Sequence, residues 1–168
     1  MKYLLPILLL VTINASAQKT GIFNYTNDKI FFSEVIATDT GKSKEQLMLQ
    51  AKQLVDNLVL AYNKRVESDN DRMKDYVYFN DGSTIKANVG FLVEQFLTFA
   101  PFSAKLAIEV ENGKYKYTLE DFNKILPPSQ TDVNPTLEAS DVMKQKVFMA
   151  KADAAIKEII TSIKDGMK

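Results

Sequence analysis

The chain has 168 residues, with 21 basic and 21 acidic side chains, no cysteine and no histidine. The balanced charge gives no clustered excess of Lys and Arg to neutralise phosphates, so nucleic acid is not an expected partner. The missing residue types exclude disulfides, Cys–His and Ser–His–Asp catalysis, and zinc sites built from histidine or thiolate ligands.

The first seventeen residues predict a secretory signal peptide. Met1-Lys2 is a basic start, Tyr3–Ile13 is an apolar run, and Ala15-Ser16-Ala17 has the small-residue form of a cleavage site. The apolar run is shorter than the ~20 residues that a membrane-spanning helix needs. We therefore expect a mature chain that begins at Gln18, has no transmembrane segment, and is periplasmic or secreted in a bacterium.

The segment after this peptide predicts an arm followed by a strand. Residues 18–28 are polar and rich in turn formers, which indicates an N-terminal arm. Lys29–Thr38 is β-branched and aromatic with apolar residues on both faces, which favours a mostly buried strand. Glu34 interrupts this strand. It is either a buried, paired carboxylate that marks a site or, as we favour, a residue at an edge or facing solvent.

A long amphipathic helix is predicted after Ser43. Ser43 and Gln46 have the spacing of a capping box, in which each side chain bonds to the backbone of the other residue. Apolar residues then recur at intervals of three and four from Leu47, and the pattern ends near Glu67. The width of the apolar stripe suits packing on a sheet.

Four strands are predicted next, as two hairpins. The first hairpin joins residues 75–80 to residues 84–89 through Asp81-Gly82, a turn signal because Gly adopts positive φ. A two-residue and a three-residue loop are both compatible with these residues, and they pair different side chains.

The second hairpin has a single consistent register. Residues 104–111 and 114–119 flank Asn112-Gly113, which predicts a two-residue type I′ turn. The facing pairs are then Glu111–Lys114, Val110–Tyr115, Glu109–Lys116, Ile108–Tyr117 and Leu106–Leu119. One face becomes charge-complementary and the other apolar, and a slip by one residue would destroy both patterns.

The C-terminal part predicts a linker and a second helix. Prolines bracket a polar linker at 127–135, and apolar residues at helical spacing run through 136–166, with Pro135 at the helix start. The order is strand, helix, four strands, helix. It predicts an α+β fold in which residues 29–126 form an antiparallel sheet domain with helices on one face, and the C-terminal helix packs on this domain.

With this order, residues 30–122 resemble a family of exported bacterial proteins known as domain of unknown function 4468. The resemblance rests on GKSKEQL at Gly41–Leu47 and on LAIEVENGKYKYTLEDF at Leu106–Phe122. It implies a TATA-binding-protein-like fold of order β-α-β-β-β-β-α. It implies no activity, and the fold name does not imply DNA binding, since function depends on sites rather than folds.

A Phe-rich segment, Phe91–Phe102, fits neither the helical nor the strand period. It contains four phenylalanines, Phe91, Phe96, Phe99 and Phe102. One interpretation is an aromatic flap or groove edge that binds a partner protein, a lipid or a hydrophobic ligand. The other, which we favour, is a strand and a corner that Pro101 closes over the core.

The remaining acidic residues predict no catalytic or metal site. Glu109 and Glu111 share a strand face, but each faces a lysine. Asp69-Asn70-Asp71 lacks the further oxygen ligands of a calcium loop. A carboxylate hydrolase would need a second acid near Glu34.

We therefore expect neither an enzyme nor a cofactor. The favoured function is a non-catalytic binding or structural module of the cell envelope with an envelope protein as partner. The alternative is a carrier of a small hydrophobic ligand.

Overall fold

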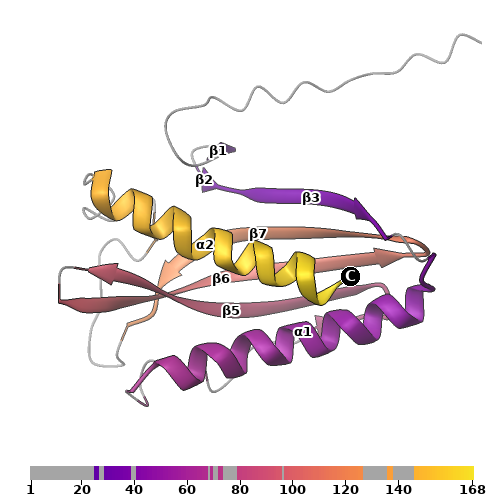
Figure 1. The fold of residues 1–168 in the computed structure, drawn as a ribbon, viewed down its shortest axis with the longest axis horizontal. Coiled ribbons are helices and arrows are strands. Elements are labelled where there is room, and N and C mark those ends of the chain that lie inside the picture. Colours follow the sequence, from indigo (N-terminus) through magenta and orange to yellow (C-terminus); the bar gives the residue numbers. More distant parts are fainter. Residues whose placement is uncertain are drawn as a thin grey trace, which may run out of the picture.

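The computed structural model shows an antiparallel sheet with two helices on one of its faces (Figure 1). The structure describes residues 25–26, 29–38, 41–67, 69, 72–73, 79–95, 97–126, 136–137 and 146–168. The predicted signal peptide, the predicted linker and all but two residues of the predicted arm lie outside this described part.

Among the described residues, five strands form the main sheet, in the order β3-β7-β6-β5-β4, with antiparallel neighbours throughout. Their bounds are Phe32–Ala37 (β3), Phe79–Asn80 (β4), Thr84–Gln95 (β5), Thr98–Glu111 (β6) and Lys114–Lys124 (β7). A separate two-stranded pair is formed by Tyr25–Thr26 (β1) and Lys29–Ile30 (β2). The predicted α+β class and the order of the main elements are confirmed.

The first helix, α1, spans Lys44–Arg65 and has the predicted capping box. The Ser43 hydroxyl accepts the Gln46 backbone N–H at 3.3 Å, and the Gln46 side-chain oxygen accepts the Ser43 N–H at 2.9 Å. Each bond satisfies a backbone donor that has no partner within the helix. The stripe on the sheet is buried at Leu47, Ala51, Leu54, Val55, Val59 and Tyr62.

The β6–β7 hairpin has the predicted register from Glu111–Lys114 to Leu106–Leu119. Gly113 has a φ of +75°, as the turn requires. On the charged face, Lys116 lies 3.0 Å from Glu109 and Lys114 lies 2.8 Å from Glu111. The other face is buried against the helices.

Gly113→Val should destabilise the domain more than Glu109→Lys does. A β-branched residue in the left-handed region costs about 1–2 kcal/mol, whereas reversing one partner of an exposed cross-strand pair costs about 0.2–1 kcal/mol. Denaturant melts of both variants beside the parent measure the two values. A larger loss from Glu109→Lys would mean that the charged face is not the exposed one.

The first hairpin has a two-residue loop, one of the two lengths that the sequence left open, and its tip is Gly82-Ser83. Asn80 pairs with Ile85, and the Asp81 N–H bonds to the Thr84 carbonyl oxygen, so Gly82 and Ser83 occupy the tip. The Asp81 carboxylate accepts the N–H groups of Ser83 (2.9 Å) and Thr84 (2.7 Å). In this Asx-turn, the bonds of the Asp81 side chain determine the register of β4 against β5, which the sequence left open.

The prediction of a mostly buried first strand is wrong, because β3 lies at an edge of the sheet and, among the described strands, pairs with β7 alone. Its alternate residues Phe32 and Ile36 pack against the core, while Val35 is 62% exposed on the other face. Apolar residues on both faces therefore do not mean burial here. Glu34 is exposed, so its interpretation as an edge residue is confirmed.

A β-bulge at Asp121 bends β7. The β6–β7 register shifts between Ser103 and Lys105, and Asp121 has a φ of +51°. This is the left-handed position that glycine usually fills in such a bulge. The Asp121 carboxylate lies 2.8 Å from the Lys105 amine and 3.1 Å from the Lys29 amine. It thus ties β2 and β6 to the bulge.

The core lies between the sheet and the two helices. The second helix, α2, spans Lys146–Gly166, and α1 and α2 lie over the same face of the sheet (Figure 1). The side chains on this face are buried alternately along the long strands, for example at Ile85, Val89, Leu106 and Ile108.

The helix predicted over 136–166 does not include its first two residues, because Thr136 bridges Asn123 of β7 and the Leu137 N–H bonds to the Phe122 carbonyl oxygen at 2.8 Å. Residues 136–137 thereby occupy the edge of β7 beyond the end of β3, and the Leu137 side chain is buried. Pro135 lies outside the described residues.

Candidate functional site

The Phe-rich segment forms the far end of a long β5–β6 hairpin. The two strands pair continuously from Phe91–Phe102 to Gln95–Thr98. Pro101 lies within β6, opposite Leu92, so the predicted corner at Pro101 is wrong. Burial alternates along both strands almost to the end of the hairpin, but apolar residues such as Leu92 and Phe99 also occupy the outward positions, so the sequence shows no period of two and the hairpin was missed.

Phe91 and Phe102 belong to the core, so they do not form part of a partner surface. Their rings stack at 5.8 Å, and both are buried. Phe91 also meets Phe122 at 6.1 Å and Phe102 meets Phe148 of α2 at 6.2 Å. Pairs of this geometry add to the free energy gained by burial.

Phe99 is different, because it stands 64% exposed near the tip of the same hairpin. Leu97 at the tip is 85% exposed, and Phe96 lies outside the described residues. Of the three phenylalanines of this segment that the structure describes, Phe99 is therefore the one that a partner can reach. Leu97 was missed, although an apolar residue between two predicted strands is a usable signal.

Phe99 borders a groove of about 360 Å³ where the hairpin meets both helices. We call it the hairpin groove; its lining residues are Arg65, Leu92, Glu94, Phe99, Lys151, Ala154, Ala155 and Glu158. Lys151 lies 3.2 Å from Glu94, and Arg65 lies 3.7 Å from Glu158. An apolar centre with a charged rim is the usual composition of a protein interface.

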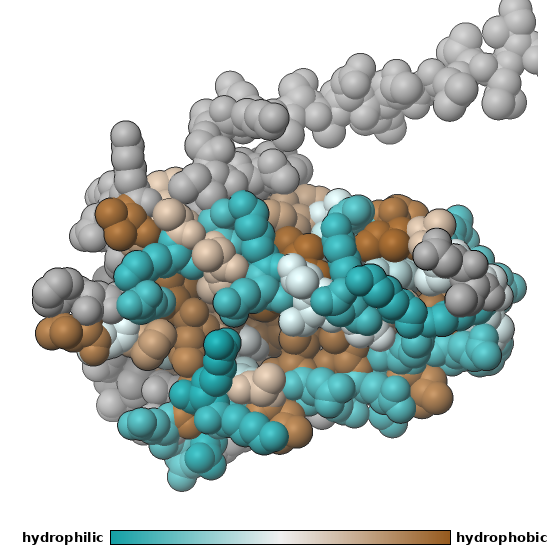
Figure 2. Space-filling model, in the orientation of Figure 1, coloured by the Kyte–Doolittle hydropathy of each residue, from teal (hydrophilic) through white to brown (hydrophobic). Residues whose placement is uncertain are grey.

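The hairpin groove opens at one end of a hydrophobic band. Figure 2 shows this band between the hydrophilic outer surfaces of α1 and α2. Along it the free space narrows to a crevice of about 100 Å³ beside Gly90, where the Tyr62 ring lies directly over the glycine. A Cβ at residue 90 would come within 2.6 Å of the Tyr62 ring.

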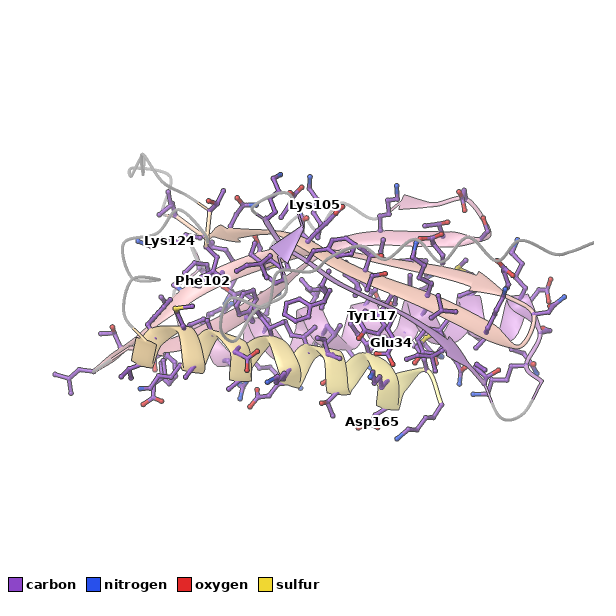
Figure 3. The ribbon with its side chains drawn as sticks, turned by 90° about the horizontal axis from the view of Figure 1, so that it is seen from above. Glu34, Phe102, Lys105, Tyr117, Lys124 and Asp165 are labelled. Carbon is purple, nitrogen blue, oxygen red and sulfur yellow. The ribbon has the colours of Figure 1, made fainter. Side chains whose placement is uncertain are left out.

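A second groove, of about 450 Å³, lies between β3 and the end of α2. Glu34 accepts hydrogen bonds there from the Lys164 amine (2.7 Å) and the Tyr117 hydroxyl (3.0 Å). Figure 3 shows Glu34 beside Tyr117 on the side of the sheet that faces α2, with Lys105 on the opposite face. The Thr38 hydroxyl in this groove is buried and has no hydrogen-bond partner among the residues that the structure describes.

Electrostatics in the second groove keep its acid charged and its phenols neutral. The bond from Lys164 is the main cause that lowers the pKa of Glu34, and the bond from Tyr117 adds to it. Burial raises the pKa of Tyr117, and the bond to Glu34 raises it further. Burial likewise raises the pKa of Tyr115. An ionised, lysine-paired glutamate is a poor general acid or base near neutral pH.

Asp121 should make the domain sensitive to acid. Hydrogen bonds from Lys105 and Lys29 lower the pKa of Asp121 below its ordinary value. The stabilisation is therefore complete above the pKa of the unfolded state, ~3.9, and is lost as the pH falls through the lower folded value.

Asp121→Asn keeps a residue that tolerates positive φ but removes the charge. Its melting temperature should consequently fall less than that of the parent between about pH 6 and pH 3. An equal fall in both proteins would contradict this role of Asp121.

The face of the sheet turned away from the helices carries paired charges. Glu109 and Glu111 each contact a lysine, as expected for a solvated face. Asp69 lies 3.2 Å from Arg72, while Asn70 and Asp71 lie outside the described residues. Within the described part of the chain, no three acidic side chains gather in a way that could hold a metal ion.

The fold is similar to those of two solved structures. The chain superposes on a DUF4468 family protein from Bacteroides ovatus with a TM-score of 0.60 and 14% identity, over 88% of this chain and 91% of that one. It superposes on a TBP-like protein from Parabacteroides distasonis with a TM-score of 0.57 and 12% identity, over 88% of this chain and 97% of that one.

The fold is TBP-like. The resemblance to the DUF4468 family is thus confirmed at the level of the fold. No protein-family model and no curated protein matches the sequence. Neither helix described in this TBP-like chain combines the length and apolarity that crossing a membrane requires.

Proposed function

We propose that this protein is a non-catalytic binding module of the bacterial cell envelope, and that it holds a partner protein in the hairpin groove. The observation that carries the proposal is the exposure of Phe99 in the lining of that groove, with Leu97 exposed at the tip of the same hairpin. Single exposed apolar side chains are common, but neighbouring ones that form a contiguous patch with a polar rim mark interaction sites. Aromatic residues within a polar rim are the common anchors of protein interfaces.

The lining of the hairpin groove suggests the chemistry of the partner. Ala154 and Ala155 leave room on α2 for an inserted apolar side chain, and Leu92 adds apolar surface beside it. The rim offers both signs of charge, from Lys151 with Glu94 and from Arg65 with Glu158. A segment with an apolar anchor flanked by mixed charges would fit this surface.

A hydrophobic-ligand carrier has less support. A carrier of this kind would enclose its ligand between helix and sheet in a pocket of ~300–1,000 Å³, but the crevice beside Gly90 has only about 100 Å³. The two grooves of about 360 and 450 Å³ reach that size, but charged side chains contribute to the lining of both. The space between the helices and the sheet is filled by buried side chains such as Phe102, Phe122 and Ile156. Mass spectrometry of the native protein under non-denaturing conditions would reveal a retained small molecule and so favour the carrier.

Export remains part of the proposal and is supported by the form of residues 1–17. Protein purified from its own host should have the intact mass of a chain beginning at Gln18. A mass that includes Met1 and Lys2 would overturn export by cleavage at Ala17.

Site-specific photo-crosslinking in the host tests the binding surface. A photoreactive amino acid at Leu97 should give a discrete protein adduct, and the additional change Phe99→Ala should remove it. The matched control places the same amino acid at Leu60, which is exposed on α1 away from the groove residues. Equal adducts at Leu97 and Leu60, or an adduct insensitive to Phe99→Ala, would contradict the proposal.

A further inference from the structure

The outer edge of β3 has hydrogen-bonding groups that no described strand pairs with. The Thr38 N–H bonds to the Gly113 carbonyl oxygen of β7 at 2.8 Å. Because residues of an antiparallel strand alternate between the two neighbouring strands, even-numbered residues of β3 direct their backbone groups at β7. Ser33, Val35 and Ala37 therefore direct their N–H and C=O groups outward.

This edge lacks most of the features that normally prevent strand pairing, and the one that it has, the inward charge of Glu34, is paired with Lys164. Such features are proline, lysine, a bulge or an inward charge. β3 has the sequence FSEVIA and pairs with β7 over six residues without a bulge. Its one charged side chain, Glu34, is held on the helix side by Lys164 and Tyr117.

The outer edge is complementary to itself. An antiparallel copy centred on Val35 would give the pairs Val35–Val35, Ser33–Ala37 and Glu34–Ile36. No like charges face one another in this register, and like charges directly opposite would be destabilising. The central pair would cover the Val35 side chain, which is 62% exposed in one chain.

We propose that two copies of this chain associate through β3, with the two-fold axis at Val35, so that the two sheets continue into one another. Such an isologous contact uses the same surface on both copies and closes as a dimer. Ile36 of the second copy then lies opposite Glu34. This places it beside the second groove, whose lining includes Glu34 and Thr38. This interface is separate from the hairpin groove, so a dimer leaves both hairpin grooves accessible.

Disulfide trapping tests the geometry directly, because the chain contains no cysteine. Two residues in a hydrogen-bonded antiparallel pair have Cα atoms about 5.5 Å apart, within the ~4.4–6.8 Å that a disulfide spans. The mature Val35→Cys protein should therefore form covalent dimers under mild oxidation. Leu60→Cys, exposed on α1, is the control and should cross-link at least tenfold more slowly.

Equal cross-linking rates for the two variants would overturn the proposal. So would a Val35→Cys protein from the host that is joined to a different protein instead of to itself, since β3 would then take a foreign strand.

Sedimentation provides an independent measurement. Val35→Pro removes an outward N–H that is not part of the ladder with β7, and proline is tolerated at such edge positions. It should weaken dimerisation at least tenfold, while Val35→Thr, which keeps the N–H and the branched side chain, should not. A parent protein that stays monomeric at about 1 mM, or Val35→Pro dimers as stable as the parent's, would exclude this interface.

Discussion

Phe102→Ala should lower the free energy of unfolding by about 3–5 kcal/mol, which is the usual cost of deleting a fully buried aromatic ring. Phe102 is 1% exposed and lies between the Phe91 ring of β5 and the Phe148 ring of α2. Removing it leaves a cavity where strand, strand and helix meet. Denaturant melts at constant pH measure the loss, which is a large part of the 5–15 kcal/mol typical of a domain.

Phe99→Ala is the matched control, because it deletes the same ring three residues away. Phe99 is 64% exposed, and changes at exposed positions stay within about 0.5 kcal/mol. The two variants therefore separate core from surface within one strand. Similar melts for Phe102→Ala and Phe99→Ala would show that the assignment of faces in this part of β6 is wrong.

Gly90→Ala should destabilise the domain by about 3 kcal/mol, at the upper end of the range for overpacked cores. The new methyl group would meet three ring atoms of Tyr62 at 2.6–2.7 Å. Tyr62 is buried in α1, so the ring can move only if the helix moves away from β5. Thermal or denaturant melts of the variant beside the parent measure the effect.

A double-mutant cycle isolates the contact between Gly90 and Tyr62. In a Tyr62→Leu background the ring is absent, so Gly90→Ala should cost much less than it does in the parent. If Gly90→Ala costs the same in both backgrounds, the close approach of Tyr62 is not the cause.

The parts of the fold that sequence predicts best are those in which two local signals agree. At the β6–β7 hairpin, Asn112-Gly113 predicts a two-residue turn at one position in the chain. The charge complementarity of Glu109 and Lys116 predicts the register that this turn produces. At α1, Ser43 and Gln46 place the start of the helix at the residue where the apolar stripe begins. Agreement between independent local signals is what makes one structure more stable than its competitors.

Other parts depend on interactions between distant residues and carry no such signal. The edge position of β3 follows from its place beside β7 and leaves Val35 exposed despite a strand-like apolar sequence. The bulge places Asp121, rather than a glycine, at positive φ, where the contacts with Lys29 and Lys105 support it. Neither feature can be inferred from neighbouring residues alone.

The candidate site was predictable in part for the same reason. The unusual density of phenylalanine in Phe91–Phe102 singled out this segment, but it predicted a strand and a corner instead of a hairpin and could not separate the buried Phe102 from the exposed Phe99. The opposite wall of the groove comes from Arg65 and from Lys151, Ala154, Ala155 and Glu158, far away in the sequence. Only the packing of α1 and α2 on the sheet brings these residues to the hairpin.

The position of β3 beside β7 also determines when the main sheet can be completed during folding. Glu34 and Tyr117, which face each other across this strand pair, are separated by 83 residues, whereas the β6–β7 hairpin closes locally. Closing so long a loop is entropically costly and slows folding. During synthesis, which begins at the N-terminus, β3 must therefore wait for β7 before it can pair within the sheet.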